Sequence, residues 1–223
     1  MTSTEFERAR RPEQKEQRRN SILTAAREML ATAPLREISL RELSRRIGLS
    51  KSNVTRYFPT REAIFFEVLN TEFDLWIDDL AKELPARNAT PEEVIDGWAS
   101  SLSRRPLLCE LVAALGDQLE RNIPTPDVRE FKLANGAAQE RLATLLTPRL
   151  GLKLSATKEL VSSAIIVVAG LWPFSIPSNA VLKALEDERL QHSKVDFERR
   201  TSRILKLIYN GMVQESMRAR RAE

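Results

Sequence analysis

The chain has 223 residues, 42% of them hydrophobic and 30% charged, with a formal net charge of +4. This balance is typical of a soluble folded protein and argues against a disordered chain. The single cysteine, Cys109, excludes an intramolecular disulfide and fits a reducing compartment. The most apolar segment, residues 160–174, is too short to span a bilayer. We therefore expect a cytoplasmic protein without a membrane segment.

The charge is unevenly distributed along the chain. Residues 1–61 contain 14 Lys or Arg and 7 Asp or Glu, a net charge of +7, whereas the remaining residues carry −3. A basic module on a mildly acidic body indicates that the first sixty residues contact a polyanion. A solvated charged face would give the same count, so charge alone leaves both interpretations open.

The first predicted elements are two helices separated by a proline. Apolar residues spaced three and four apart predict an amphipathic helix over residues 15–31, which Pro34 ends. Ser39 and Glu42 have the spacing of a capping box. In such a box the Ser39 hydroxyl accepts a hydrogen bond from the amide of residue 42, and the Glu42 side chain reaches back.

Two short helices, residues 39–47 and 50–58, are predicted on either side of a turn at Gly48. This layout is that of a helix-turn-helix, whose second helix lies in the major groove of DNA. The side chains expected on its exposed side are basic, hydroxyl and amide groups, which suit base edges and phosphates. We expect DNA contacts from Arg41, Lys51, Ser52, Asn53, Thr55, Arg56, Tyr57 and Arg61, with phosphate as the target of Arg61 and either base or phosphate as that of Arg41.

The rest of the chain is also predicted to be helical. A long helix begins at Arg61, and Thr90-Pro91 and Pro106 mark further helix starts. The segment 156–174 is apolar on nearly all sides, which predicts burial on most of them. The last helix covers residues 197–220. No segment alternates with a period of two, so the fold class is all-α.

The stretch SLRELSRRIGLSKSNVTRYFPTREAIF, residues 39–65, resembles the DNA-binding region of the tetracycline-repressor (TetR) family of bacterial transcriptional regulators. Gly48, Ser50, Phe58 and Glu62 match the family pattern, while Thr55 replaces a frequent Tyr. The resemblance implies an N-terminal three-helix bundle with the helix-turn-helix, here residues 1–60. It also implies a larger helical ligand-sensing and dimerisation domain, here residues 61–223, a homodimer and, usually, repression.

A ligand pocket is expected among the helices between Arg61 and about Leu146, whose aromatic and aliphatic side chains are suited to lining one. These are Phe66, Phe73, Trp76, Trp98, Leu108, Val112, Leu115 and Phe131. Few ionisable groups share their faces, so we expect a mostly apolar small-molecule effector held by one or two hydrogen bonds. The alternative is a fully packed core without an effector.

A homodimer contact is expected from residues 156–174 and 197–215, as four helices from two chains, with Val167 and Ile208 inside it. Two copies would read a palindromic double-stranded operator.

Other classes of protein remain as alternatives. The first is a helical module whose basic end binds nucleic acid without sequence preference. The second is an enzyme, but no catalytic constellation and no Cys/His metal spacing is present, so we expect no catalytic residues, no metal and no cofactor. The only histidine, His192, has polar neighbours, and Cys109 is expected to be a small buried hydrophobe.

Overall fold

The computed structural model describes residues 3–85, 88–121 and 123–222, with side chains described over 13–85, 88–121 and 123–219. Within these ranges every regular element is a helix and none is a strand. The all-α prediction is confirmed.

The N-terminal part is a small three-helix bundle. Its elements are α1 (Ser3–Leu30), the short 3-10 helix η1 (Leu35–Glu37), α2 (Leu40–Arg46) and α3 (Lys51–Thr55). Ile22, Leu43 and Val54, one from each α-helix, are almost completely buried and form its core. Two expected boundaries were wrong: α1 begins well before residue 15, and the second short helix ends at residue 55 rather than 58. The chain turns there because the amides of Tyr57 and Phe58 both donate to the Val54 carbonyl.

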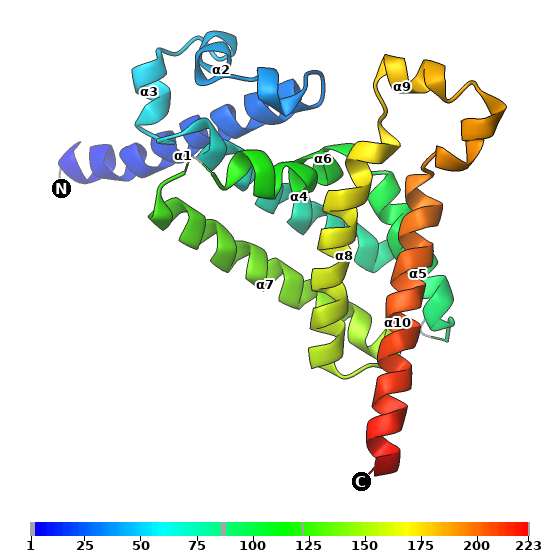
Figure 1. Ribbon diagram of the computed structural model, residues 1–223. Helices are drawn as coiled ribbons and strands as arrows, with labels where there is room; N and C mark the ends of the chain where they lie inside the picture. Colours follow the sequence, from blue (N-terminus) through cyan, green and yellow to red (C-terminus); the bar gives the residue numbers. More distant parts are fainter. Residues whose placement is uncertain (1–2, 86–87, 122, 223) are drawn as a thin grey trace.

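The larger part is built from the remaining helices. They are α4 (Arg61–Glu83), α5 (Pro91–Ser103), α6 (Pro106–Ala114), the π-helical turn η2 (Leu115–Leu119), α7 (Thr125–Leu150), α8 (Leu154–Ser175), α9 (Asn179–Ala184), the 3-10 helix η3 (Glu188–Ser193) and α10 (Phe197–Ala222). Figure 1 shows α1 to α3 gathered at one end of the molecule and α8 and α10 side by side near the other. Helix α4 joins the two parts, because it packs against α1 as well as α7.

Helix starts follow the capping signals in the sequence. Thr60 accepts a hydrogen bond from the Ala63 amide at the start of α4, and Thr90 and Glu93 form a complete capping box at the start of α5. At Ser39 only half of the expected box is present. The hydroxyl of Ser39 accepts from the Glu42 amide, but the Glu42 carboxylate pairs with Arg45 instead of reaching back.

Helix α8 is two-sided in the single chain: one face is buried, and the other, which the prediction placed against a second chain, is exposed. Leu160 and Ala164 are buried, whereas Ile166 is 71% exposed and Phe174 is 70% exposed. At 22 residues α8 is also long and apolar enough to cross a membrane by length and composition, so the length argument from residues 160–174 was wrong. Its packing against α6, α7 and α10 is nevertheless that of a core helix.

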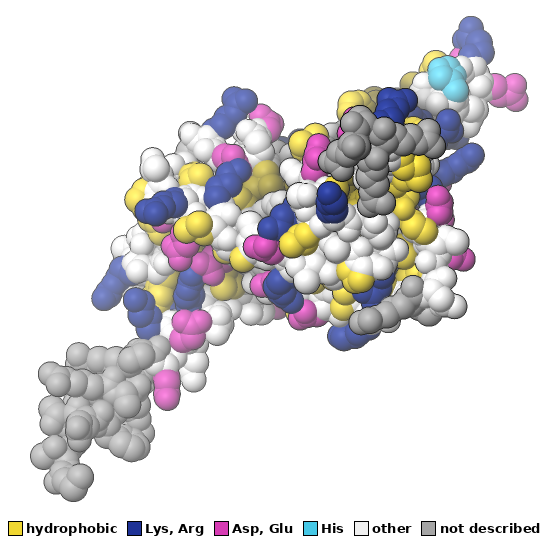
Figure 2. Space-filling model, turned by 90° about the horizontal axis from the view of Figure 1, so that it is seen from below, with side chains coloured by type: hydrophobic (Ala, Val, Ile, Leu, Met, Phe, Trp, Pro, Cys, Tyr) yellow, Lys and Arg dark blue, Asp and Glu magenta, His cyan; other side chains and the backbone are white. Residues whose placement is uncertain are grey.

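The segment between α8 and α10, residues 176–196, is called the linking arm below. It contains α9 and η3, and no residue of either is buried. The arm stands out from the helical body beside the ends of α8 and α10 (Figure 1), and the space-filling view shows it projecting with the only histidine near its tip (Figure 2). Apolar side chains, including Ile176 and Leu182, are exposed along it.

Candidate functional site

The turn between α2 and α3 fixes their relative geometry. Gly48 adopts φ +66°, in the left-handed region that favours glycine, and the Leu49 amide donates to the Ser44 carbonyl at 2.9 Å. Ser44 is 4% exposed, and its hydroxyl is turned onto the Leu40 carbonyl at 2.6 Å, so a small side chain fills the space between the helices. Ser50 accepts from the Asn53 amide and begins α3. The predicted helix-turn-helix is therefore present.

The surface of this motif is rich in hydrogen-bond donors. Of the predicted DNA-contacting residues, Arg41, Lys51, Ser52, Asn53 and Arg56 are exposed, whereas Thr55 and Tyr57 are half-buried. The Thr55 hydroxyl donates to the Ser52 carbonyl at 3.1 Å, so part of its hydrogen-bonding capacity is used within the helix.

The cations of the motif fall into two groups. Arg45 pairs with Glu42, and Arg46 with Glu28 of α1. Arg41, Lys51 and Arg56 form no ion pair with any residue whose side chain is described. These three are therefore the cations that can neutralise phosphate without first breaking a salt bridge.

Arg61 lies differently from the other predicted contacts. Its Nη1 donates to the Ile38 carbonyl at 3.0 Å, its Nε donates to Glu62 at 2.8 Å, and the guanidinium lies 5.8 Å from the Phe65 ring centroid. The side chain thus holds the first turn of α4 against the segment that precedes α2. Nη2 is the nitrogen with which Arg61 could contact a phosphate.

Two ion pairs connect α1 to α4. Arg19 pairs with Glu67, and its guanidinium lies 4.6 Å from the Phe58 ring centroid. Burial, with an additional contribution from Glu130, raises the pKa of the Glu67 carboxyl against the opposing effect of Arg19. Arg27 pairs with the buried Glu72 at 2.5 Å. These pairs connect α4 to α1, the helix against which α2 packs.

An apolar cavity of about 20 Å³ lies between α4, α5, α6, α7 and α8. The structure brings five of the eight predicted pocket residues together in its wall: Phe73, Trp76, Trp98, Leu108 and Val112. The others lie elsewhere. Phe66 and Phe131 stack on each other with ring centroids 4.1 Å apart, near Arg19, and Leu115 begins the π-helical turn.

The remaining wall residues were missed by the sequence reasoning. They are Leu102, Leu142, Val161, Ala164, Ile165 and Val168, and four of them belong to α8. The apolar character of residues 156–174 predicted burial on most sides and a dimer contact, but no face of this segment was assigned to the pocket. Because such a helix must bury a face within its own chain as well, the same signal could have placed one face at the cavity.

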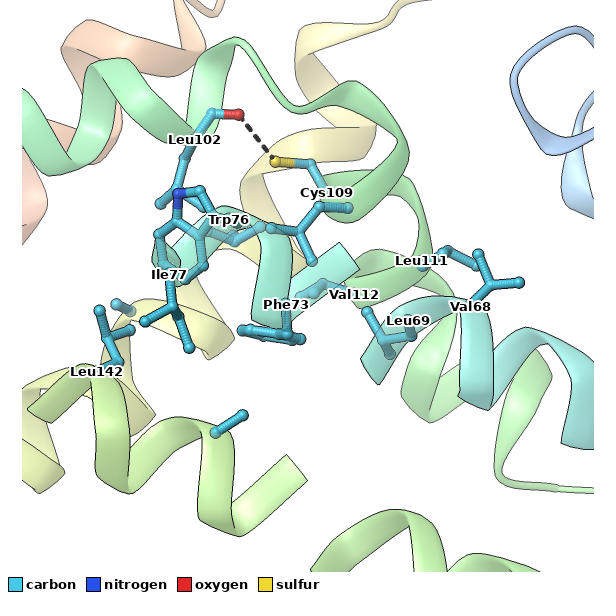
Figure 3. Close-up of a cluster of buried hydrophobic side chains, with 14 of the residues drawn as sticks. Val68, Leu69, Phe73, Trp76, Ile77, Leu102, Cys109, Leu111, Val112 and Leu142 are labelled. Carbon is cyan, nitrogen blue, oxygen red and sulfur yellow. Dashed lines mark hydrogen bonds between the residues drawn. The ribbon is translucent and has the colours of Figure 1, made fainter. Parts of the chain in front are cut away.

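Most of the polar atoms around the cavity are satisfied. Trp76 Nε1 donates to the Ser101 hydroxyl at 2.9 Å, and that hydroxyl donates to the Trp98 carbonyl at 2.7 Å. Figure 3 shows the Cys109 thiol facing the Leu102 carbonyl, 3.4 Å away, within the same cluster of side chains. Burial raises the pKa of this thiol to about 12. The exception is Trp98 Nε1, which is buried and has no acceptor among the described residues.

Large apolar side chains are exposed on both α8 and α10. They are Ile166 and Phe174 of α8 and Leu207 of α10, and Leu207 has the charged side chains of Arg199 and Arg203 beside it. The predicted dimer residues Val167 and Ile208 are half-buried. No group of three or more His, Cys, Asp or Glu side chains within the described ranges could hold a metal ion.

Comparison with known families agrees with this architecture. The profile for bacterial regulatory proteins of the tetR family matches residues 22–68, and the profile for a tetracyclin repressor-like C-terminal domain matches residues 70–216. The chain belongs to the TetR family. TetR-family proteins are transcriptional regulators rather than enzymes, with a helix-turn-helix that binds DNA and a helical C-terminal domain that binds small molecules.

Solved TetR-family structures share the fold at low sequence identity. A regulator from Rhodococcus sp. RHA1 is 20% identical, with a TM-score of 0.53 over 85% of this chain and 97% of that one. The fatty acid degradation regulator FadR from Bacillus halodurans is 14% identical, with a TM-score of 0.54 over 87% and 95%. FadR from Bacillus subtilis, solved with stearoyl-CoA, is 15% identical, with a TM-score of 0.51 over 86% and 97%. Among curated proteins, none matches the chain.

Proposed function

We propose that this TetR-family regulator is a cytoplasmic repressor that binds a palindromic operator as a homodimer and releases it when a mostly apolar small molecule binds. The observation that carries the DNA-binding half is the exposed face of α3 and its surroundings. There, Arg41, Lys51 and Arg56 are free of ion pairs with the described side chains, and the Asn53 amide is exposed. We take residues 1–60 as the DNA-binding domain and 61–223 as the effector and dimer domain.

The expected contacts divide into two kinds. Asn53 is suited to the bidentate recognition of adenine, and Arg41 or Arg56 to guanine or phosphate. Lys51 and Nη2 of Arg61 are suited to phosphate, while Ser52, Thr55 and Tyr57 add polar contacts to the backbone or base edges.

The dimer is supported by the exposed apolar face of α8 and α10. Ile166, Phe174 and Leu207 are each more than 60% exposed, at 71%, 70% and 64%. Large contiguous apolar patches are uncommon on monomeric proteins and mark interaction surfaces. A second copy of the same face would cover this one by two-fold symmetry and bring two α3 helices to successive major grooves.

The effector is expected to enter the cavity between α4 and α8. No ionisable side chain lines it, so charged ligands have no counter-charge there. A cavity of about 20 Å³ holds roughly one water, so an effector must displace wall side chains to enter. The stearoyl-CoA complex of Bacillus subtilis FadR, whose fold this chain shares, is consistent with a lipophilic effector.

Release would follow from the continuity of α4. Phe73 and Trp76 of α4 line the cavity, while Arg61, Glu67 and Glu72 of the same helix contact the DNA-binding part. A ligand that tilts α4 would move both α3 helices of the dimer. It can release DNA only by binding the DNA-free conformation more tightly than the DNA-bound one.

The test begins with selection of an operator from random duplexes by the purified protein. A repressor of this kind should prefer its selected sequence over random duplex by about a thousandfold or more. A nonspecific nucleic-acid-binding module would show no such preference. Lipophilic compounds are then screened for quenching of tryptophan fluorescence, and those that bind should weaken operator binding in proportion. Ala164→Leu, which fills the cavity, should abolish the ligand response and leave operator affinity intact.

A further inference from the structure

We propose that a second ligand site lies where the DNA-binding part meets α4 and α7, and that it takes a small organic cation with a primary ammonium group. The site, called the junction cavity below, has a volume of about 120 Å³. It is bounded by α1, the turn between α3 and α4, α4 itself and the start of α7. None of its lining residues belongs to the apolar cavity between α4 and α8, so the inference goes beyond the proposed effector and does not depend on it.

The junction cavity has an excess of negative charge. Glu67, Asp127 and Glu130 line it, and Arg19 is the one basic residue among the described residues of its wall. The Arg19 guanidinium is already engaged, because it pairs with Glu67 and lies 4.6 Å from the Phe58 ring centroid. The carboxyl groups of Asp127 and Glu130 pair with no cation whose side chain is described.

This excess acts on Glu67. Burial raises the pKa of its carboxyl, and the negative charges of Glu130 and Glu16 raise it further, against the opposing effect of Arg19. A cation bound in the junction cavity would relieve the repulsion between these carboxylates, whereas an anion would add to it. The electrostatics therefore favour a positively charged ligand.

Two hydrogen-bond acceptors of the lining residues are also left over. Asn70 Oδ1 and Asp127 Oδ2 are buried, and neither accepts a hydrogen bond from a residue within the described ranges. A buried acceptor without a donor lowers stability, and an ammonium group brings N–H donors together with its charge. Arg19 Nη1 is a buried donor without an acceptor in the same part of the chain, so a hydroxyl on the ligand would add a further bond.

The wall suits an organic cation better than a metal ion. No three His, Cys, Asp or Glu side chains in the described parts of the chain lie close enough together to hold a metal. Polar and apolar atoms contribute almost equally to the surface of the junction cavity, and the rings of Tyr57, Phe66 and Phe131 are part of its wall. Aromatic rings attract ammonium groups and also pack against the hydrocarbon part of an amine.

Three probes with chains of the same length separate charge from size. Butylammonium carries the charge and the donors, 1-butanol is neutral, and butyrate is an anion. Binding to the full chain is measured by calorimetry and by the side-chain amide ¹⁵N–¹H resonances of Asn70, identified by their loss in Asn70→Asp. Ionic strength is matched with sodium chloride throughout, because salt screens charge interactions. Butylammonium should shift the Asn70 resonances and bind at least about tenfold more tightly than 1-butanol. Butyrate should not bind measurably.

Asp127→Asn removes one negative charge from the wall with little change of shape. Butylammonium should bind this variant about tenfold more weakly, the loss expected for one charged hydrogen bond, while 1-butanol binding stays within about twofold. Glu130→Gln should weaken butylammonium binding in the same direction. Glu188→Gln removes the same charge from η3 in the linking arm, where the side chain is exposed, and should change neither affinity.

The opposite results would overturn the proposal. Equal affinities for butylammonium and 1-butanol would show an apolar contact only. Unchanged butylammonium binding in both Asp127→Asn and Glu130→Gln, or binding that leaves the Asn70 resonances in place, would show that the cation binds elsewhere. The absence of saturable butylammonium binding would leave the junction cavity to water and refute the site. These titrations contain no DNA, so failure to select an operator would count against the proposed function and leave this site standing.

Discussion

Arg61 and Ile38 are joined by a hydrogen bond of 3.0 Å, from Nη1 of the arginine at the start of α4 to the isoleucine carbonyl before α2. The two residues are 23 positions apart in the sequence, and the bond fixes the DNA-reading pair against the helix that enters the effector domain. Arg61 was expected only to contact DNA, but its side chain also holds α4 against the segment before α2 in the free protein.

The dual role of Arg61 gives the first prediction. Arg61→Ala should lower the free energy of unfolding by about 1–2 kcal/mol, because the Ile38 carbonyl loses a charged donor at a partly exposed site. If Nη2 also holds a phosphate, the slope of log K against log salt should become shallower by about 0.9. Urea unfolding and a salt titration of operator binding measure the two effects separately. Unchanged stability would contradict the structural role of the bond.

The second prediction concerns α3. Lys51→Ala should weaken binding to every duplex alike and reduce the salt slope by about 0.9, because it removes one phosphate contact. Asn53→Ala should cost about 1–3 kcal/mol on the selected operator and relax the preference at one base position. Lys183→Ala, which removes an exposed lysine from α9, is the matched control and should change neither quantity. Docking through α3 is wrong if both α3 variants behave like the control.

The third prediction concerns assembly. Leu207→Glu should give a monomer with strongly reduced operator affinity. Leu207 is 64% exposed in the single chain but would be covered in the proposed dimer, so the substitution would bury a charge there. Leu133→Glu makes the same change on α7, where the leucine is 66% exposed, and should leave the dimer intact. Val167→Glu and Ile208→Glu should resemble Leu207→Glu. Sedimentation of the unmodified protein as a stable monomer at micromolar concentration would exclude the interface.

The fourth prediction concerns alkaline pH. The thiol pKa of Cys109 is raised from 9.0 to about 12 by burial, so above pH 9 the unfolded chain loses a proton that the folded chain keeps. The contribution of this thiol to the free energy of unfolding is fully present below pH 9. It is lost as the pH rises from 9 towards 12, by up to about 1.4 kcal/mol per pH unit. Cys109→Ala should therefore show a flatter decline of unfolding free energy over this range. Parallel curves for the two proteins would contradict the shift.

The N-terminal part was predictable because its signals are local. Gly48 in a left-handed turn, the hydroxyl caps of Ser39 and Ser50, and the regular spacing of Ile22 and Ala26 each act within a few residues. The positions of the helix ends were less predictable from the sequence. Phe58 is buried as expected, but it is reached by a turn and not by a continued helix.

The apolar cavity was only partly predictable because it depends on packing between distant helices. The apolar spacing of Phe73 and Trp76 shows that one face of α4 is buried, but not which helices cover it. Phe66 lies on the same helix and is equally buried, yet it stacks on Phe131 outside the cavity. The unpartnered donor of Trp98 has no signature in the sequence, since it results from the absence of an acceptor in the folded core.

The buried thiol of Cys109 also makes the protein convenient for distance spectroscopy. A cysteine introduced in place of the exposed Ser52 on α3 would be the reactive thiol at neutral pH, because the native one is 0% exposed and its pKa is raised. In a homodimer, a spin label on that cysteine has one partner, its own symmetry copy. The separation of the two recognition helices then becomes a single measurable length, to be compared with the roughly 34 Å between successive major grooves.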